Sequence, residues 1–203
     1  MNPLPRDFYA RDPISVARDL LGKVVVRHSP NGIAAGRIVE VEAYLSRRDP
    51  ACHAHRGMTK RNATMFGPAG HAYVYTIHTR WCLNAVTEAV GEGSAVLIRA
   101  LEPLAGIDLM QARRRREKLL DLARGPGRLC QALAIDKQYD GWDLTGGTEL
   151  WIAHDSDAGD IARQIVRAPR IGISRAKGRL LRFFLAGNRF VSGRRAIPAP
   201  ASR

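Results

Sequence analysis

One stretch of alternating side chains, residues 34–45, constrains the fold more than any other part of this 203-residue chain. Apolar residues occupy every second position from Val39 onward, and the positions between them hold Glu40, Glu42 and Tyr44. Because successive side chains of a strand point to opposite faces, the pattern predicts a strand with one apolar face. The opposite face is then expected to carry two carboxylates beside a phenol.

The remaining sequence predicts short strands joined by turns, together with a few helices. Asp12-Pro13, followed by an apolar helical pattern as far as Gly22, predicts the first helix, and Pro30-Asn31-Gly32 predicts a hairpin turn. The other expected strands lie at residues 23–27, 71–77, 94–101, 150–153 and 182–185, and the other expected helices at 107–122 and 126–134. This order predicts an α+β fold, a single domain over residues 1–203 built on an antiparallel sheet, with a frayed tail at 196–203.

The chain is strongly basic, with 32 Lys and Arg residues against 19 Asp and Glu residues and a net charge of +13. No acidic residue follows Asp160, so the last fifth of the sequence has charges of one sign. Such an excess indicates an anionic partner, and nucleic acid is the first candidate. The run Arg113–Arg116 fits either a phosphate contact or a solvated helix face, and the sequence leaves both open.

Composition also bounds where the protein acts. No uncharged apolar run approaches the length needed to cross a bilayer, and the first residues do not resemble a signal peptide, so no membrane partner is expected. Three widely spaced cysteines fit a reducing compartment rather than a disulfide framework. We therefore expect a cytoplasmic protein, associated with the nucleoid if the source is bacterial.

A candidate reaction site follows from the neighbouring strands. Tyr73 and Tyr75 share one strand face, which could meet the face that carries Glu42. Arg99 lies inside an apolar strand and needs an anionic partner, for which Glu42 and Glu102 are both candidates. A carboxylate among aromatic rings, held ionised by a fixed cation, can deprotonate a water without a metal. The alternatives are that the two tyrosines are ordinary sheet packing and that Arg99 forms a structural ion pair.

Two local patterns do not predict sites of other kinds. Cys52, His53 and His55 have no second Cys/His pair at zinc-site spacing, so no metal is expected. Gly67-Pro68-Ala69-Gly70 lacks the lysine and hydroxyl of a phosphate loop. Both patterns lie in the polar stretch Ser46–Gly70, which is long for a simple connection and therefore a candidate functional loop.

Ten segments, taken together and in order, resemble the alkyladenine (3-methyladenine) DNA glycosylase family. They include Val41-Glu42-Ala43-Tyr44 and Gly125-Pro126-Gly127-Arg128-Leu129-Cys130. The full set is 41–44, 49–53, 61–62, 65–70, 73–75, 81–84, 97–103, 125–133, 169–174 and 182–184. The resemblance covers nearly the whole chain and implies a curved antiparallel sheet surrounded by helices. It also implies removal of alkylated or deaminated purines from duplex DNA by a monofunctional enzyme, one that leaves the backbone intact.

The family's catalytic roles fall on three residues of this chain. By resemblance, Glu42 is the general base for the attacking water, and Arg99 and the backbone carbonyl of Ile171 help to hold that water. No lysine nucleophile stands beside Glu42, which argues against an imine intermediate. The resemblance therefore implies hydrolysis with no cofactor and no metal.

The remaining roles concern the base pocket and the DNA. Tyr44, His53 and Tyr75 resemble the walls of the pocket for the extruded base, and Asn84 the residue that discriminates against the amine of normal guanine. The strand-to-strand segment at 76–81 is one residue shorter than the family pattern, so His78 replaces a wedge tyrosine. The other implied DNA contacts are Lys60, Arg61, Met65 and Arg80. The expected partner is double-stranded DNA with damaged purines, bound by a monomer, and the alternative is a catalytically inactive nucleic-acid-binding protein.

Overall fold

Strand β2, Gly32–Tyr44, is the centre of the sheet in the computed structural model, which describes residues 1–155 and 164–193. Along one edge β2 pairs with β5, Ser94–Ala105. Along its other edge it pairs first with β1, Val24–Ser29, and then with β8, Arg182–Leu185. All three pairings are antiparallel, and the end of β2 that carries Glu42 therefore lies between β5 and β8.

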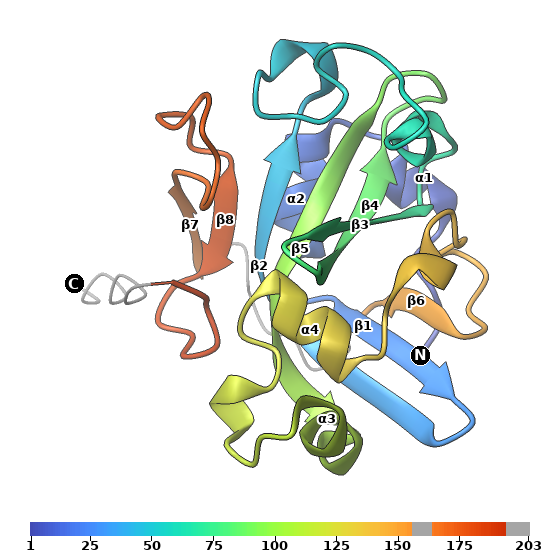
Figure 1. The fold of residues 1–203 in the computed structure, drawn as a ribbon, viewed down its shortest axis with the longest axis vertical. Helices are drawn as coiled ribbons and strands as arrows, with labels where there is room; N and C mark the ends of the chain where they lie inside the picture. Colours follow the sequence, from blue (N-terminus) through green and yellow to red (C-terminus); the bar gives the residue numbers. More distant parts are fainter. Residues whose placement is uncertain (156–163, 194–203) are drawn as a thin grey trace.

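The other strands extend this sheet on both sides. The order is β3-β4-β5-β2-β1-β6, and β8 pairs with both β2 and β7. The added strands are β3 (Ala72–Ile77), β4 (Arg80–Thr87), β6 (Leu150–Ala153) and β7 (Ile165–Ala168). Figure 1 shows the sheet strongly curled, with the β7–β8 pair at one edge and the β3–β4 hairpin in front of β5.

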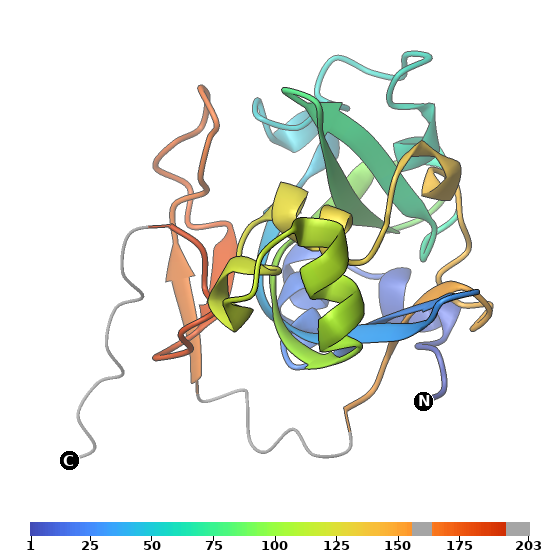
Figure 2. The same cartoon turned by 60° about the horizontal axis from the view of Figure 1, so that its bottom comes forward.

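Four α-helices cover the sheet on two sides in the described part of the chain. In Figures 1 and 2, α1 (Arg6–Tyr9) and α2 (Pro13–Leu20) lie behind the long strands, and α3 (Ile107–Arg114) and α4 (Pro126–Ala132) lie in front. Short 3-10 turns occur at Ser46–Arg48, Ala63–Phe66, Leu119–Asp121 and Lys137–Tyr139. The predicted α+β fold with a curved antiparallel sheet is thus confirmed. No helix within residues 1–155 and 164–193 is long and apolar enough to cross a membrane.

Three sequence-based assignments differ from the structure. The sequence pattern missed β4 and β7; β4 is buried along most of its length and so lacks the alternation that marks a half-exposed strand. The helix predicted at 107–122 ends at Arg114, because Arg115 adopts a left-handed conformation. The Arg114 side chain then donates hydrogen bonds to the carbonyls of Leu122 and Asp121, which fold back over the helix end. The predicted tail at 196–203 lies outside the described residues.

The long polar stretch Ser46–Gly70 packs against the sheet and is not a free loop. Cys52, Ala54, Met65 and Phe66 form a second apolar cluster with residues of β3, β4 and β5. Gly93 admits this packing, because a Cβ there would lie 2.7 Å from the ring of Phe66. The cluster holds His53 beside β3 and so brings the loop to the face that carries Tyr73 and Tyr75.

Candidate active site

Glu42 is the buried carboxylate around which the site is built. Its Oε1 accepts a hydrogen bond from the backbone N–H of Ile171 at 2.8 Å, and its Oε2 accepts one from the Tyr44 hydroxyl at 2.9 Å. Burial raises the pKa of Glu42, against the opposing effects of the Arg99 charge and these two hydrogen bonds. The structure thus brings Ile171 to Glu42, and the contact it shows is made by the Ile171 N–H.

Arg99 contacts two glutamates at once. Its Nη1 lies 3.3 Å from Oε1 of Glu42, and its Nε lies 3.4 Å from Oε1 of Glu40. Of the two partners that the sequence left open, Glu42 is therefore the one, since Glu102 pairs with Arg37 instead. Glu40 is a second partner that the sequence analysis did not assign.

The strand register explains how Arg99 reaches these carboxylates. Glu40 stands opposite Ala100 and Val41 stands opposite Ile98, so β5 has one extra residue at Arg99. Such a bulge bends the strand and re-aims a side chain, and bulges are frequent beside active sites. Register shifts of this kind are not visible in the amino-acid pattern of a single strand.

Tyr44 is held from behind by a buried ion pair. The guanidinium of Arg170 lies 4.6 Å from the centroid of the Tyr44 ring. Arg170 also donates to both carboxylate oxygens of Asp49, at 2.5 and 2.7 Å, and to the carbonyl of Ala43 at 2.9 Å. Burial alone would raise the pKa of Asp49, but the hydrogen bonds and charge of Arg170 lower it below its ordinary value. The pair therefore stays ionised and fixes one face of the Tyr44 ring.

His53 and the two tyrosines of β3 form a compact aromatic group. The ring centroids of Tyr73 and Tyr75 are 5.2 Å apart in a stacked arrangement, and those of His53 and Tyr75 are 4.6 Å apart, edge to face. The Nδ1 of His53 lies 3.0 Å from the Tyr73 hydroxyl. Burial and the charge of Arg61 lower the pKa of His53, so the ring is neutral at neutral pH.

A cavity of about 410 Å³, a size typical of ligand pockets, lies next to these groups. Glu42 does not line it, but contacts Tyr44, Arg99 and Ile171, which do. Tyr44, His53, Tyr75, Arg99 and Ile171 all line it, so five residues that the sequence singled out meet in one place. Asn84 does not line this cavity. With Met65 it lines a smaller cavity of about 20 Å³ behind the tyrosines, and its Nδ2 donates to the carbonyl of Tyr73 at 2.9 Å.

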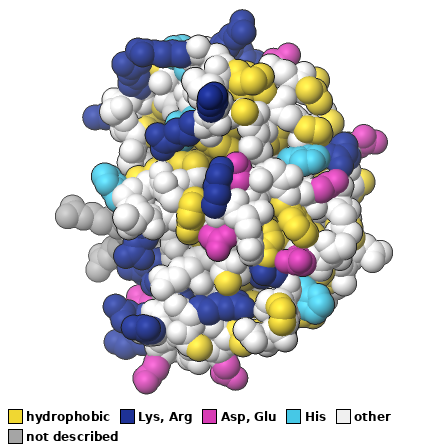
Figure 3. Space-filling model, turned by 45° about the vertical axis from the view of Figure 1, so that its right-hand side comes forward, with side chains coloured by type: hydrophobic (Ala, Val, Ile, Leu, Met, Phe, Trp, Pro, Cys, Tyr) yellow, Lys and Arg dark blue, Asp and Glu magenta, His cyan; other side chains and the backbone are white. Residues whose placement is uncertain are grey.

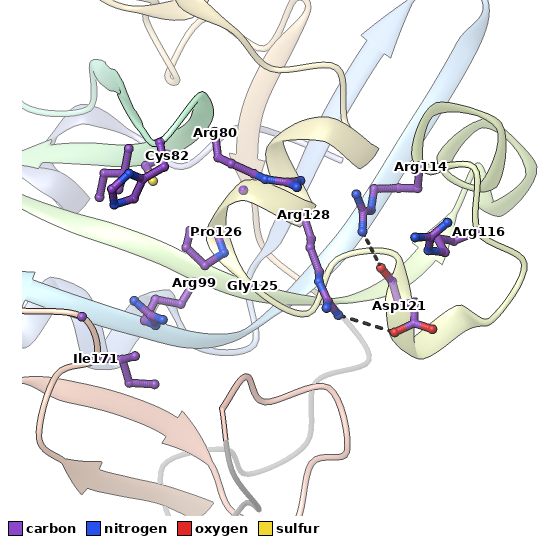
Figure 4. A pocket seen from close by; sticks show the side chains of 14 residues that line it. Arg80, Cys82, Arg99, Arg114, Arg116, Asp121, Gly125, Pro126, Arg128 and Ile171 are labelled. Atoms are coloured by element: carbon purple, nitrogen blue, oxygen red, sulfur yellow. Dashed lines mark hydrogen bonds and ion pairs between the residues drawn. The ribbon is translucent and has the colours of Figure 1, made fainter.

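An arginine-rich groove of about 660 Å³ adjoins this cavity and shares Arg99 and Ile171 with it. Figure 4 shows Arg80, Arg114, Arg116 and Arg128 around the groove. Burial lowers the pKa of Arg114, and the positive charges of Arg128, Arg80 and Arg116 lower it further. Asp121 is the one acidic residue that the described part of the chain contributes to the lining. Positive charge therefore exceeds negative charge along the groove, as expected of a surface that receives an anion.

The predicted DNA-contacting residues occupy three different places. His78 and Arg80 lie at the turn between β3 and β4 and line the groove. Lys60 and Arg61 are exposed on the Ser46–Gly70 stretch, away from the groove lining. Met65 is buried and lines the small cavity beside Asn84. Figure 3 shows basic side chains gathered along the left margin of that view, with acidic side chains spread over its centre, right side and bottom.

Several residues of the site carried a weak signal in the sequence or none. Glu40 shares the alternation of Glu42, which could have marked it, whereas Asp49 and Arg170 lie 121 positions apart and show no pairing pattern. The Arg113–Arg116 run divides between two environments. Arg113 donates to the carbonyl of Ala132, whereas Arg114 and Arg116 line the groove.

Comparison of the sequence with known proteins shows which family it is similar to. Residues 7–189 match the sequence profile described as methylpurine-DNA glycosylase.

No group of three or more His, Cys, Asp or Glu side chains that could hold a metal occurs in the described parts of the chain.

Individual relatives match over nearly their whole length. A protein of Methanoculleus marisnigri is 52% identical over 193 residues, which is 94% of this chain and 99% of that relative. A protein of Carboxydothermus hydrogenoformans is 50% identical over 93% of this chain and 98% of its own, and one of Mesorhizobium japonicum is 48% identical over 96% and 92%. Each of the three is named "Putative 3-methyladenine DNA glycosylase".

Proposed function

The chain belongs to the methylpurine-DNA glycosylase family, and from that premise we propose that it hydrolyses the N-glycosidic bond of alkylated or deaminated purines in duplex DNA. The observation that carries the proposal is the buried Glu42 carboxylate, whose three partners Tyr44, Arg99 and Ile171 all line a ligand-sized cavity. The product would be a free base and an abasic site in an intact backbone.

The reaction needs a base for water and a place for the departing purine. A water beside Glu42 attacks C1′ of the deoxyribose as the bond from C1′ to N9 breaks, and the electron pair of that bond leaves with the purine. The water proton passes to Glu42, whose raised pKa makes it a stronger base than an exposed glutamate. The Arg99 guanidinium keeps the carboxylate ionised before the proton arrives.

The pocket suits a purine that carries positive charge. Tyr44 and Tyr75 line the cavity together with His53, which is neutral and does not repel a cation. A cation facing an aromatic ring gains about 0.5–2 kcal/mol, which is very roughly two- to thirtyfold in affinity. A base must leave the stack to reach this pocket, and a lesion that pairs badly costs less to extrude. Asn84 and Met65 line the adjoining small cavity, which shares Tyr44, His53 and Tyr75 with this pocket.

The arginine-rich groove is the proposed seat of the DNA backbone. It continues from the base cavity through Arg99 and Ile171, so a strand whose base enters the cavity would pass along it. We propose that the protein binds this duplex DNA as a monomer. With DNA as the substrate, we propose a location in the cytoplasm, at the nucleoid if the source is bacterial.

Salt dependence tests the groove. Log affinity falls linearly with log salt, and removing one phosphate contact makes this negative slope less steep by about 0.9. Arg114→Gln and Arg128→Gln should each make the slope less steep by about that amount. Arg115→Gln is the matched control, because Arg115 is exposed and outside the groove lining. An unchanged slope in both groove variants would show that the phosphates bind elsewhere.

The activity is tested by incubating the protein, in the presence of a chelator, with duplex DNA that contains 3-methyladenine. Free 3-methyladenine and uncut backbones with abasic sites are expected. Glu42→Gln should bind the DNA but release base about 10²- to 10⁴-fold more slowly, the usual contribution of a general base. Glu102→Gln, a similar change in a pair with Arg37, should release base at the wild-type rate.

Each rival function has its own signature in the same assay. Binding without base release by the wild-type protein would identify a non-catalytic nucleic-acid-binding protein. Metal-dependent strand cleavage would identify a nuclease. Full activity of Glu42→Gln would show that another group activates the water. A panel of 3-methyladenine, 7-methylguanine, hypoxanthine and ethenoadenine would rank the lesions.

A further inference from the structure

Glu40 is a second buried carboxylate beside the proposed general base. It lies two residues before Glu42 on β2, and both side chains are fully buried. Two carboxylates that are buried away from solvent need compensating positive charge and hydrogen bonds, since an unpaired buried charge is costly. The contacts of Glu40 show which groups provide them.

Three segments hold Glu40 in place. Its Oε1 accepts a hydrogen bond from Nη1 of Arg182 on β8 at 2.9 Å, and its Oε2 accepts one from the backbone N–H of Ser192 at 2.7 Å. The same Oε1 lies 3.4 Å from Nε of Arg99. That buried Nε has no hydrogen-bond partner among the described residues, so Glu40 interacts with this edge of Arg99 through charge.

The buried charges of this cluster balance. Three guanidinium groups with little exposure, those of Arg99, Arg170 and Arg182, face three carboxylates, and a fourth, that of Arg179, is 39% exposed and lies 3.9 Å from Asp49. The carboxylates are those of Glu40, Glu42 and Asp49. Removing the charge of Glu40 alone therefore leaves an excess of one positive charge next to Glu42.

The distances indicate that Arg99 is shared between its two partners. Strong charge-assisted N–H···O bonds are about 2.7–2.9 Å long, whereas Arg99 lies 3.3 Å from Glu42 and 3.4 Å from Glu40. An arginine with Glu42 as its single partner could approach closely and in a two-pronged manner, and it would then stabilise the ionised form more strongly. Glu42 would then have a lower pKa and would be a weaker base.

We propose that Glu40 is a positioning residue that holds Arg99 between two carboxylates, so that Arg99 orients Glu42 without suppressing its basicity. This inference rests on the proposed function, in which Glu42 activates the water. Glu40 itself touches neither water nor purine in this scheme. Of its three partners, Arg182, Ser192 and Arg99, only Arg99 lines the base cavity, whereas all three partners of Glu42 line it. It acts through Arg99.

Glu40 is one of several groups that set the protonation of Glu42. The others are Arg99 on β5, Tyr44 on β2, Tyr75 on β3, Cys82 on β4, and Arg170 with the Ile171 N–H from the segment between β7 and β8. The phenols of Tyr44 and Tyr75 have raised pKa values, chiefly because they are buried, and burial raises the pKa of Cys82 to about 11. These three groups are therefore neutral in the working range of pH. His53 also lines the cavity and has a lowered pKa, so the limb is assigned to Glu42 by its shift between variants that leave His53 unchanged.

The test compares Glu40→Gln with Glu102→Gln in base release against pH. With Glu40 neutral, Arg99 should move onto Glu42 and lower its pKa, so the acidic limb should shift by about one unit to lower pH. The plateau rate should fall about five- to tenfold, because the base is weaker. Glu102→Gln should leave both the limb and the plateau at wild-type values. A limb that stays in place, whatever the stability of Glu40→Gln, would mean that Glu40 is only structural.

Arg182→Gln provides the opposite change and a safeguard if Glu40→Gln does not fold. Loss of the Arg182 charge leaves Glu40 uncompensated, so the limb should shift to higher pH. Arg182 contacts Glu40 but lines neither cavity. A shift in the same direction as Glu40→Gln, or no shift, would overturn the inference.

A titration that does not depend on activity separates this inference from the proposed function. The carboxyl carbon of Glu42, labelled with ¹³C and followed by NMR in the free protein, should show the same two shifts of pKa. Shifts in the titration without base release by the wild-type protein would leave the charge-sharing intact and reject the glycosylase function. Base release together with an unmoved titration would reject the role of Glu40.

Discussion

Two regions lie beside connected cavities but are built in opposite ways. One is the charged cluster of Glu40, Glu42, Asp49, Arg99, Arg170 and Arg182, and the other is the hairpin tip Ile77–Arg80. The cluster collects side chains from strands β2, β5 and β8, from the Ser46–Gly70 stretch and from the segment before β8, and all its carboxylates are fully buried. The tip consists of four consecutive residues, and Ile77 is 47% exposed. Charges act strongly where water is excluded, whereas exposed side chains are free to meet a partner.

This difference separates chemistry from contact in the molecule. Changes in the cluster should alter reaction rate or folding by large factors, because its charges are few, buried and mutually dependent. Changes at the tip should alter how well the protein extrudes a base, with smaller effects. Four predictions, in order of decreasing size, test that division.

The largest effect is expected from Asp49→Asn. The change leaves the buried Arg170 without its anionic partner, which typically costs about 3–5 kcal/mol of stability. The pKa of Asp49 is lowered in the fold, so the pair contributes stability above the unfolded-state pKa and loses it as the pH falls through the folded-state pKa. Chemical denaturation should therefore show a large deficit at neutral pH that shrinks in acid. A deficit that is the same at every pH would contradict the assignment.

The second effect is the pH dependence of the wild-type enzyme. Glu42 must be ionised to accept a proton, and its pKa is raised by burial. Base release should therefore fall about tenfold per pH unit below a limb that lies above the ordinary pKa of glutamate. Single-turnover rates across the acid range measure the limb. A limb at or below the ordinary value would show that Glu42 is not desolvated in the complex with DNA.

The third effect concerns the residue that fills the gap left by an extruded base. The sequence predicts His78, and the structure adds Ile77, which continues the Tyr73–Tyr75 face of β3 and lines both the groove and the base cavity. Apolar side chains are frequent wedges between base steps. Ile77→Ala and His78→Ala should each slow excision of well-paired lesions several-fold, with the larger loss for Ile77.

The same two variants contain their own control. Badly paired lesions need less help to leave the stack, so their excision should change less. If His78→Ala excises every lesion at the wild-type rate, His78 has no wedge role. Equal losses for all lesions would indicate damage to the pocket rather than to extrusion.

The smallest effect is expected at Thr79. His78 and Thr79 have φ values of 45° and 66°, a conformation that two-residue hairpin turns require and that a β-branched residue adopts at a cost. Thr79→Gly should therefore stabilise the protein by about 0.5–1 kcal/mol in thermal unfolding while leaving the rate at Glu42 unchanged. A fall in that rate would mean that the tip and the cluster are coupled.

Much of the fold followed from local pattern. The alternation in residues 34–45 predicted β2, Asp12-Pro13 predicted a helix that Asp12 caps through the Ser15 N–H, and Pro30-Asn31-Gly32 predicted the β1–β2 hairpin. Strand β4 was missed because burial removes the alternation that identifies a strand. The early end of α3 was missed because side-chain contacts of Arg114 with a later segment decide it.

The sequence by itself determined the kinds of chemistry available: an acid beside a phenol on one strand face, an arginine within an apolar strand, an excess of positive charge, and motifs that resemble one DNA glycosylase family. Only the tertiary structure decided that Arg99 is shared by Glu40 and Glu42, that Asp49 meets Arg170 behind Tyr44, and that Arg114 and Arg116 join Arg128 in one groove. The physical reason is that side-chain direction along a strand depends on neighbouring residues. Pairing between residues far apart in the sequence depends instead on strand register, on a bulge and on burial, which exist only once the chain has folded.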